Sequence, residues 1–395
     1  ASDVYKRQVN RITLDSIADH TAELINNTVT SSIWDIWGIE VRNINSLNIV
    51  NNTVYNCSTR GIYCILCSSI LIKNNNISLN GLKKSLDSYG NAGIMLEYST
   101  GCFIENNTLS NNNYGISLKE CRYMTIINNN FINDGLYIIN KEKKDYTTHT
   151  IYNNKVDNKE IGYFINLDSV TISKPFGGLI LFNCTNVTIK NQEITNTDIG
   201  ILLIHCNRSF IINNNLSRND ISGIVLQNCN KILVSNNSIA YNYRYGLWTW
   251  SIPFTDWQRS EIWITYNLFK NNSGYGLIIS GDVFYIHHNN FIYNNPGEKN
   301  YQCIQSGNDF FWYDTESLTG NYWKHSHNND SLKIENSIAP GDLYPLSEPC
   351  PPYFGNFGKP WTENSTTSAP FFSLLFVVLT FLMIIYAKDT IKTNK

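Results

Sequence analysis

A glycine followed by isoleucine or leucine recurs along most of this chain, and this repeat constrains the fold more than any other feature. The glycine stands at Gly38, Gly61, Gly93, Gly115, Gly135, Gly178, Gly200, Gly223, Gly246 and Gly276. Where no insertion intervenes, the interval is about 22 residues. Self-similarity at one fixed period indicates an architecture of stacked copies of a small unit.

Each glycine is followed by the same residue types at the same distances. Aliphatic residues stand one, three and eleven positions later, in short alternating segments that indicate several short strands per repeat. An amide stands fourteen positions later, at Asn52, Asn75, Asn107, Asn129, Gln192, Asn214 and Asn237. A repeat of this length cannot enclose a core alone, so successive repeats must stack.

These patterns predict an all-β fold, a parallel β-helix solenoid of about 22 residues per coil in which each coil rises about 4.8 Å. The aliphatic columns become internal ladders, and each amide bonds to the amide of the next coil. In two central coils we expect inward side chains to stack in pairs, namely Ile201 on Ile224, Leu203 on Leu226, Cys206 on Cys229 and Asn214 on Asn237.

The same frame extends to the start of the chain. With Thr13 at the glycine position, Leu14, Leu24 and Asn27 fall in the ladder columns. The solenoid is then already under way where the sequence begins, and no export signal precedes it. We therefore expect an N-terminally truncated fragment.

Composition agrees with strands and polar turns. About 60 of the 395 residues are asparagine, isoleucine and tyrosine are abundant, and only 10 are proline. Branched and aromatic side chains suit a pleated surface. Lysine and arginine (30) nearly balance aspartate and glutamate (32), and this sparse, balanced charge predicts no nucleic-acid partner.

One column is rich in cysteine. It stands six positions after the glycine, at Cys67, Cys121, Cys184, Cys206 and Cys229. A small, buryable side chain at a fixed position is typical of an internal rung. The neighbouring His205 should point outward, so we interpret the His205–Cys206 pair as packing and not as a metal site.

The third insertion, after Ile252, lies in the most aromatic stretch of the chain. Sugar rings present apolar faces that stack on aromatic planes, and exposed tryptophan is costly without a partner, so this stretch predicts carbohydrate binding. The alternative is that these rings pack the flank of the solenoid. The candidate binding residues are Tyr243, Arg244, Trp248, Trp250, Asp256, Trp257 and Arg259.

The last quarter of the chain changes character. We predict solenoid coils over 11–300, a capping region over 301–346 and a Pro/Ser/Thr-rich linker over 347–369. Residues 370–387 are apolar and long enough for a transmembrane helix, and lysines follow in a cytoplasmic tail over 388–395. We therefore expect a single-pass protein of the cell membrane whose solenoid faces outside, with Asn364 as the best glycosylation candidate.

Several segments resemble a known family. The coils "GIVLQNCNKILVSNNSIAYN" and "GISLKECRYMTIINNNFIND", with the closing "GNYW" and "DLYPL", look like NosD-type right-handed parallel β-helix repeat proteins. These belong to a group of carbohydrate-binding proteins and sugar hydrolases. The resemblance implies a right-handed helix, export, a prokaryotic surface protein and, in some members, copper delivery.

Three functions remain open. The leading hypothesis is a membrane-anchored extracellular protein that binds carbohydrate or is structural. A polysaccharide-modifying enzyme needs cooperating carboxylates, and Glu97 and Glu120 come nearest on neighbouring coils, so we favour a non-catalytic role. Copper delivery would need clustered His or Met, and we interpret the pair His287–His288 as strand histidines, with no metal and no cofactor.

Overall fold

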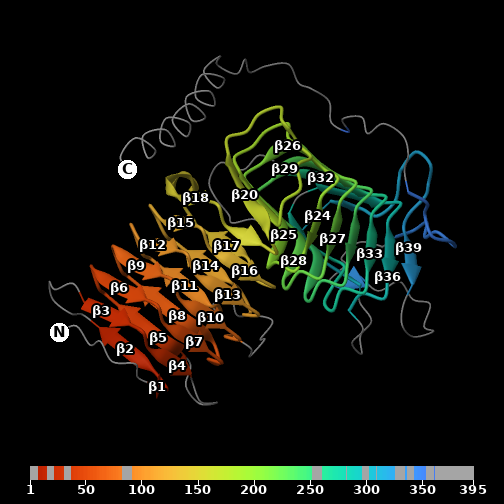
Figure 1. Cartoon of the computed structure of the whole chain (residues 1–395). Coiled ribbons are helices and arrows are strands. Elements are labelled where there is room, and N and C mark those ends of the chain that lie inside the picture. Colours follow the sequence, from red (N-terminus) through yellow and green to blue (C-terminus); the bar gives the residue numbers. More distant parts are fainter. Residues whose placement is uncertain are drawn as a thin grey trace. The chain divides into compact units, whose positions relative to one another are not determined.

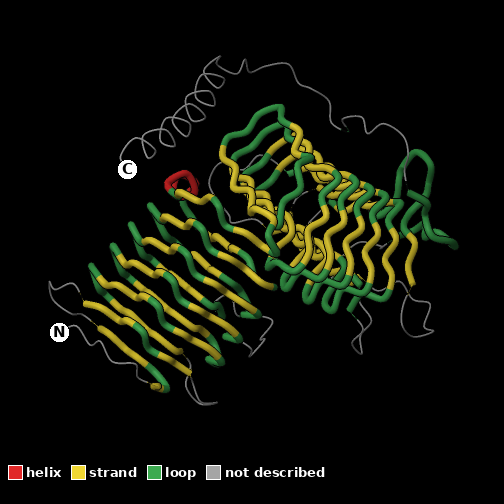
Figure 2. The backbone as a smooth tube through the Cα atoms, in the orientation of Figure 1, coloured by secondary structure: helices red, strands yellow, loops and turns green. Residues whose placement is uncertain are grey.

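The computed structural model is a parallel β-solenoid. It describes residues 8–15, 22–30, 37–81, 91–250, 260–281, 283–295, 302–307, 309–324, 334–335, 342–352 and 360. The strands form two stacks of coils, red to yellow and green to blue in Figure 1. Figure 2 shows that turns separate consecutive strands at the corners of each coil. No helix among the described residues is long and apolar enough to cross a membrane, and the predicted span 370–387 lies outside them.

The first stack has three sheets, which we name A, B and C in the order in which each coil visits them. Sheet A consists of β2 (Ile12–Asp15), β5 (Trp37–Arg42), β8 (Arg60–Ile65), β11 (Ile94–Glu97), β14 (Ile116–Lys119) and β17 (Leu136–Ile139). Sheet B consists of β3 (Ala22–Ile25), β6 (Leu47–Val50), β9 (Ile70–Lys73), β12 (Phe103–Glu105), β15 (Thr125–Ile127) and β18 (Thr150–Tyr152). Sheet C consists of β1 (Gln8–Val9), β4 (Thr28–Thr30), β7 (Thr53–Tyr55), β10 (Asn76–Ser78), β13 (Thr108–Ser110), β16 (Asn130–Ile132) and β19 (Lys155–Val156). A short 3₁₀ helix, η1 (Lys143–Thr148), precedes β18.

The second stack has sheets D, E and F in the same order. Sheet D consists of β20 (Lys159–Ile165), β22 (Gly178–Phe182), β25 (Ile199–Ile204), β28 (Ser222–Gln227), β31 (Tyr245–Trp250), β34 (Leu277–Gly281), β37 (Cys303–Gly307) and β40 (Ile334–Glu335). Sheet E consists of β21 (Thr171–Ile172), β23 (Thr188–Lys190), β26 (Asn207–Ile212), β29 (Asn230–Ser235), β32 (Glu261–Thr265), β35 (Val283–His287) and β38 (Phe310–Phe311). Sheet F consists of β24 (Glu193–Thr195), β27 (Asn215–Ser217), β30 (Ser238–Ala240), β33 (Leu268–Lys270), β36 (Asn290–Ile292) and β39 (Tyr322–Lys324).

The internal ladders are confirmed in the predicted register. Ile201 pairs with Ile224 and Leu203 with Leu226, and all four side chains are buried. Asn214 donates from its Nδ2 to Oδ1 of Asn237 at 2.9 Å. The predicted columns therefore line the inside of the second stack.

A correction concerns the first coil. Ile12 pairs with Ile39 and Thr13 pairs with Glu40, so Thr13 does not occupy the glycine position. The frame proposed from the sequence is wrong by two residues in β2. It is correct one strand later, because Leu24 pairs with Ile49.

The two stacks are joined by a reversal that the repeat did not predict. β19 pairs with β20 antiparallel, whereas the other strand pairs described are parallel. Asp157 and Asn158 form the connection, with φ of 46° and 68°. Positive φ at both central residues is the signature of a type I′ hairpin turn. Sheet C of the first stack thus continues into sheet D of the second.

The outer faces of sheets A and D pack on each other near this reversal. One hydrophobic cluster contains Met95 and Tyr137 from the outer side of sheet A together with Leu202 and Val225 from that of sheet D. A hydrogen bond joins the stacks as well, because the backbone N of Gly115 donates to the side-chain Oδ2 of Asp198 at 3.0 Å. The outer faces of sheets A and D are therefore partly buried.

Candidate functional site

The described residues of the predicted aromatic site lie in different surroundings. Tyr243 is exposed in the bend between β30 and β31. Arg244 is buried and places its guanidinium 5.9 Å from the ring centre of Tyr114 in the first stack. Trp248 and Trp250 stack on each other, with ring centres 5.9 Å apart, and pack against the hydrophobic cluster shared by both stacks.

The structure thus brings Trp248 and Trp250 together as half-buried rings on sheet D, whereas Tyr243 is exposed before that strand begins. Asp256, Trp257, Arg259 and Asn364 lie outside the described residues. A glycan site on the third insertion stays a prediction.

His205 and Cys206 occupy a packed environment. The His205 ring lies edge-on to Tyr146 and Phe182, at 6.5 and 5.8 Å between ring centres, so it points away from its own coil but into the packing between the stacks. Burial lowers the pKa of His205 to about 4 and raises the pKa of the Cys206 thiol. A neutral imidazole beside a protonated thiol agrees with a packing role for this pair.

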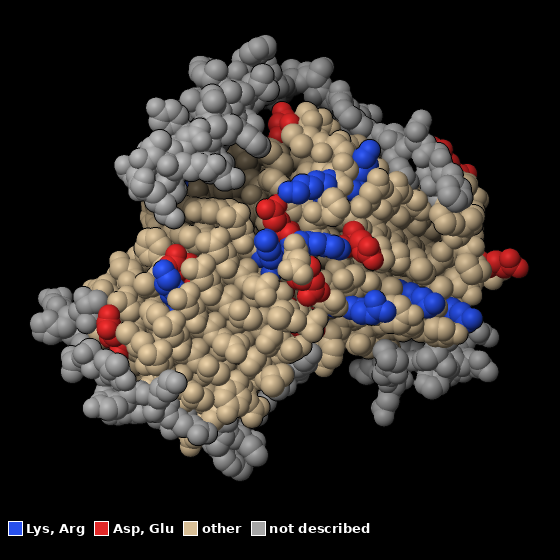
Figure 3. Space-filling view, in the orientation of Figure 1, with Lys and Arg blue, Asp and Glu red and all other residues tan. Residues whose placement is uncertain are grey.

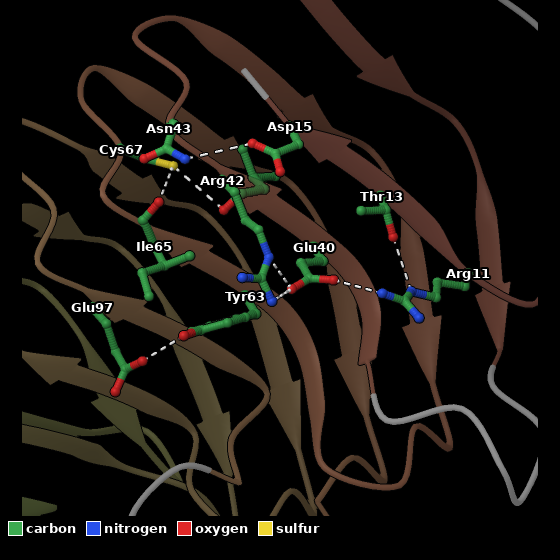
Figure 4. A network of polar contacts seen from close by, with 11 residues as sticks. Arg11, Thr13, Asp15, Glu40, Arg42, Asn43, Tyr63, Ile65, Cys67 and Glu97 are labelled. Carbon is green, nitrogen blue, oxygen red and sulfur yellow. Dashed lines mark hydrogen bonds and ion pairs between the residues drawn. The ribbon is translucent and has the colours of Figure 1, made fainter. Parts of the chain in front are cut away.

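A polar network occupies the outer side of sheet A in the first coils (Figure 4). Glu40 is only 1% exposed and lies between two arginines. Its carboxylate accepts from Arg11 Nη2 at 2.7 Å and from Arg42 Nε at 2.6 Å. Both guanidinium groups also lie over the ring of Trp37, at 5.0 and 5.7 Å from its centre. A buried charge is thereby paired on two sides, as burial of a carboxylate requires.

A second part of the network centres on Glu97. The Tyr63 hydroxyl donates to its Oε2 at 2.5 Å, and Lys119 Nζ donates to its Oε1 at 3.0 Å. Burial raises the pKa of the Glu97 carboxyl, but Tyr63 and Lys119 lower it by more, so that pKa lies below its usual value. Burial and the hydrogen bond to Glu97 raise the pKa of Tyr63, and the Arg60 guanidinium lies 4.1 Å from its ring centre.

The accessible part of this network is the edge where the strands of sheet A end. Arg42, Ile65, Glu97 and Lys119 form one column of paired residues on four neighbouring coils. The corner after this column carries Leu66 and Tyr98, which are 55% and 48% exposed. We name this surface, formed by Arg42, Leu66, Tyr98 and Lys119, the sheet A rim.

Charge at the rim is unevenly exposed. The side chains of Arg42 and Lys119 are 39% and 41% exposed, whereas those of Glu40 and Glu97 are 1% and 10% exposed. Asp15 is an exposed carboxylate close by, with its Oδ1 3.5 Å from Asn43 Nδ2. Elsewhere, in the view of Figure 3, charged residues are sparse and both signs lie next to each other.

Of the two carboxylates named from the sequence, Glu97 belongs to this network. Glu120 accepts a hydrogen bond from the backbone of Lys141 through Oε1, at 3.1 Å, and does not join the network. The signal that was available lies at the outward positions two and four residues after each glycine, where the first stack carries Glu40, Arg42, Tyr63 and Glu97. Outward positions vary from coil to coil, so they form no repeated column in the sequence.

Within the described part of the chain, one group of three side chains could hold a metal ion, His287, His288 and Asp314. Their nearest ligand atoms all lie within 4.8 Å of one another. The sequence had singled out the two histidines but not the carboxylate.

Comparisons with known proteins concern the fold. The sequence matches the family of the right-handed β-helix region over residues 16–169 and 162–310. No curated protein sequence matches the chain. The A-module of the mannuronan C-5 epimerase AlgE4 from Azotobacter vinelandii is similar at 10% identity over 76% of this chain and 90% of that one, with a TM-score of 0.33.

Two further solved structures are similar over less than two thirds of their own length. The Dettilon tailspike protein is 12% identical over 79% of this chain and 62% of that one, with a TM-score of 0.33. The periplasmic alginate epimerase AlgG is 14% identical over 72% of this chain and 65% of that one, with a TM-score of 0.28.

Proposed function

The chain belongs to the right-handed β-helix family, and we propose that it binds carbohydrate along the sheet A rim, with an acidic polysaccharide as the preferred ligand. The observation that carries this proposal is the combination, on neighbouring coils, of half-exposed cationic groups with an exposed aromatic ring. Arg42 and Lys119 supply the cations, and Tyr98 supplies the ring.

The geometry of the rim suits an extended chain of sugars. Neighbouring coils are about 4.8 Å apart, so the four coils of the rim present side chains over about 14 Å. The apolar face of a sugar ring can stack on Tyr98 and Leu66, while its hydroxyls accept hydrogen bonds from Arg42 and Lys119.

The exposure of the charges favours an acidic ligand. The buried carboxylates of Glu40 and Glu97 already accept from Arg11, Tyr63 and other donors of the network. The guanidinium of Arg42 and the ammonium of Lys119 retain donors toward solvent, and a uronate carboxylate can take these in charge-assisted hydrogen bonds. We therefore expect affinity to fall as ionic strength rises.

A polysaccharide-modifying enzyme is the second candidate, since Tyr63 and Glu97 share a 2.5 Å hydrogen bond. Tyr63 is only 5% exposed, and its raised pKa keeps the hydroxyl protonated and directed at Glu97. A proton-abstracting base needs both access to the substrate and a pKa near the working pH. These two features favour binding over catalysis at this site.

The experiment is a binding screen of neutral and uronate-containing polysaccharides with the full chain in detergent. Tyr98→Ala should weaken binding of an acidic ligand by about 1–3 kcal/mol, the cost of losing a stacked aromatic anchor. Tyr241→Ala is the matched control, because Tyr241 is 49% exposed on the second stack and also has positive φ. Binding of no glycan, or equal losses in both variants, refutes the proposal, and turnover of a bound polysaccharide supports the enzyme.

We further propose that the solenoid faces outside the cell and that residues 370–387 anchor it in the membrane. The apolar composition of this segment and the lysines after it support the proposal, as does the export implied by the NosD-type resemblance. Protease added to intact cells should remove the solenoid and leave a short tail. Protection of the solenoid from the protease contradicts this orientation.

A further inference from the structure

We propose that His287, His288 and Asp314 bind one divalent transition-metal ion of the zinc type. The site lies in the second stack, away from the sheet A rim, and is independent of carbohydrate binding. Two imidazoles and a carboxylate are a common ligand set for such ions, and three protein ligands leave positions open for water or another ligand.

The backbone brings the two histidines to the same side of the strand. His287 is the last residue of β35, and along a regular strand its neighbour would point to the opposite face. His288 instead has φ of 58°, in the left-handed region. As a result, the two Nδ1 atoms lie 2.8 Å apart and face each other.

A turn on the next coil brings in the carboxylate. Tyr285 of β35 pairs with Phe311 of β38 on that coil. The chain then leaves the coil in a turn, which an antiparallel bridge between Asp314 and Thr319 closes. It returns to the coil at Gly320, whose O accepts from His288 N at 2.7 Å, so the turn that carries Asp314 lies beside His288.

Surrounding groups hold the ligands in place. Thr319 Oγ1 lies 2.7 Å from Nε2 of His288, the nitrogen that faces away from the proposed ion. The ring of Tyr266 stacks on His288, with centres 4.8 Å apart and planes 11° apart. Asp314 Oδ1 accepts from the backbone N of Glu316 at 2.9 Å, which orients the carboxylate. Outer contacts of this kind are what orients metal-binding histidines in proteins.

The ligand chemistry selects the class of ion. The set contains no sulfur atom, which favours Zn²⁺ or Co²⁺ over Cu⁺. Two nitrogens bound to a tetrahedral zinc ion are about 3.3 Å apart, given Zn–N bonds of about 2.05 Å. The imidazoles therefore need to separate by about 0.5 Å on binding, a shift that small ring rotations can supply.

The test uses the full chain in detergent, stripped of metal with a chelator and titrated with Co²⁺ and with Zn²⁺. We expect one equivalent of Co²⁺ to give visible absorption bands that Zn²⁺ abolishes. Asp314→Asn and His288→Gln should weaken Zn²⁺ binding at least 10-fold, and Thr319→Val about 10-fold. Glu316→Gln, a carboxylate two residues from Asp314, is the matched control and should bind as the native chain does.

Several results would overturn the assignment. These are the absence of Co²⁺ bands in the native chain, equal affinity in Asp314→Asn and Glu316→Gln, or tighter binding of Cu⁺ than of Zn²⁺. Circular dichroism checks that each variant keeps its strands. Should His288→Gln fail to fold, Asp314→Asn decides the question, because Asp314 lies in a turn outside the strands.

Discussion

Asparagine serves two different purposes at adjacent positions of each coil. Asn51, Asn74 and Asn106 are exposed corner residues with φ of 57°, 55° and 55°. Asparagine tolerates this left-handed conformation better than other residues with a side chain, apart from aspartate. The next residue in each case, such as Asn75, is buried and belongs to the amide ladder. The high asparagine content follows in part from repeating this pair along the solenoid, although Tyr266 and His288 take the corner position in two coils.

At the same scale, Glu97 shows how one carboxylate organises the polar network. Glu97→Gln should destabilise the fold by about 1–3 kcal/mol at pH 7, because Tyr63 and Lys119 lose a charged acceptor. Since the pKa of Glu97 is lowered in the folded state, its contribution is present above the unfolded value of 4.5 and is lost as pH falls through the folded pKa.

Denaturant unfolding at pH 7 and pH 3 measures this effect. The difference between the native chain and Glu97→Gln should shrink at the lower pH. Glu105→Gln is the control, because Glu105 forms a more exposed ion pair with Lys73 and should cost under about 1 kcal/mol. A Glu97→Gln difference that is independent of pH contradicts the role given to its charge.

Among the elements, the amide ladder carries much of the specificity of the coil. Asn214→Leu should destabilise the fold by about 1–3 kcal/mol, because Gln192 N loses its acceptor and both Asn237 Oδ1 and Ile189 O lose the Asn214 Nδ2 donor. Asn215→Leu makes the same replacement one residue later, at an exposed position, and should change stability by less than about 0.5 kcal/mol. Equal effects in a denaturant titration would argue against the ladder.

A second amide ladder runs along the next corner and ends in a carboxylate. Asn80 donates to Asn112, and Asn112 donates to Asp134 through both its backbone N and its Nδ2. Asp134 therefore occupies the ladder position that Asn80 and Asn112 hold on the two preceding coils. Burial and the nearby Asp198 raise its pKa well above the usual value.

Asp134→Asn should therefore stabilise the fold at pH 7 by about 1–2 kcal/mol. A raised folded pKa means that the ionised form costs stability as pH rises from 3.8 through the folded pKa, so the gain should vanish below about pH 3.8. Thermal unfolding across this pH range provides the measurement. A loss of stability at pH 7 would show that the carboxylate is needed in its charged form.

For the whole molecule, the repeat predicts each coil but not the arrangement of the coils. Gly–Ile spacing and the amide column define the interior, because those positions face a constant environment in every coil. The reversal depends on the two-residue turn Asp157–Asn158, a signal that a search for the period passes over.

The packing of the outer faces of sheets A and D was also visible in the sequence, as a pattern of apolar residues. Strands of sheet D read as continuous apolar runs, such as "GLILF" in β22, and so does β17 of sheet A with "LYII", whereas β5, further from the reversal, alternates in "GIEVR". Parallel strands that are buried on both faces have the former pattern. The sheet A rim could not be derived in the same way, because its residues differ from coil to coil and acquire a role only through their neighbours.

Tyr146 tests the contact between the stacks. It is fully buried, stacks on Phe182 at 4.8 Å, and its hydroxyl accepts from Gln227 Nε2 at 3.2 Å. Tyr146→Ala should cost about 3–5 kcal/mol in denaturant unfolding. Tyr152→Ala is the control, since that side chain is 50% exposed. An equal loss of unfolding free energy in both variants would show that the contact between the stacks contributes little.

Side-chain footprinting tests the central claim, that acidic carbohydrate lies along the sheet A rim, most directly. Arginine- and lysine-specific reagents are applied with and without a bound uronate oligosaccharide, and labelling is read by peptide mass spectrometry. Protection of Arg42 and Lys119 is expected, with Lys190 of β23 labelled equally in both states. Unchanged labelling at Arg42 and Lys119, or protection confined to the second stack, would contradict the account.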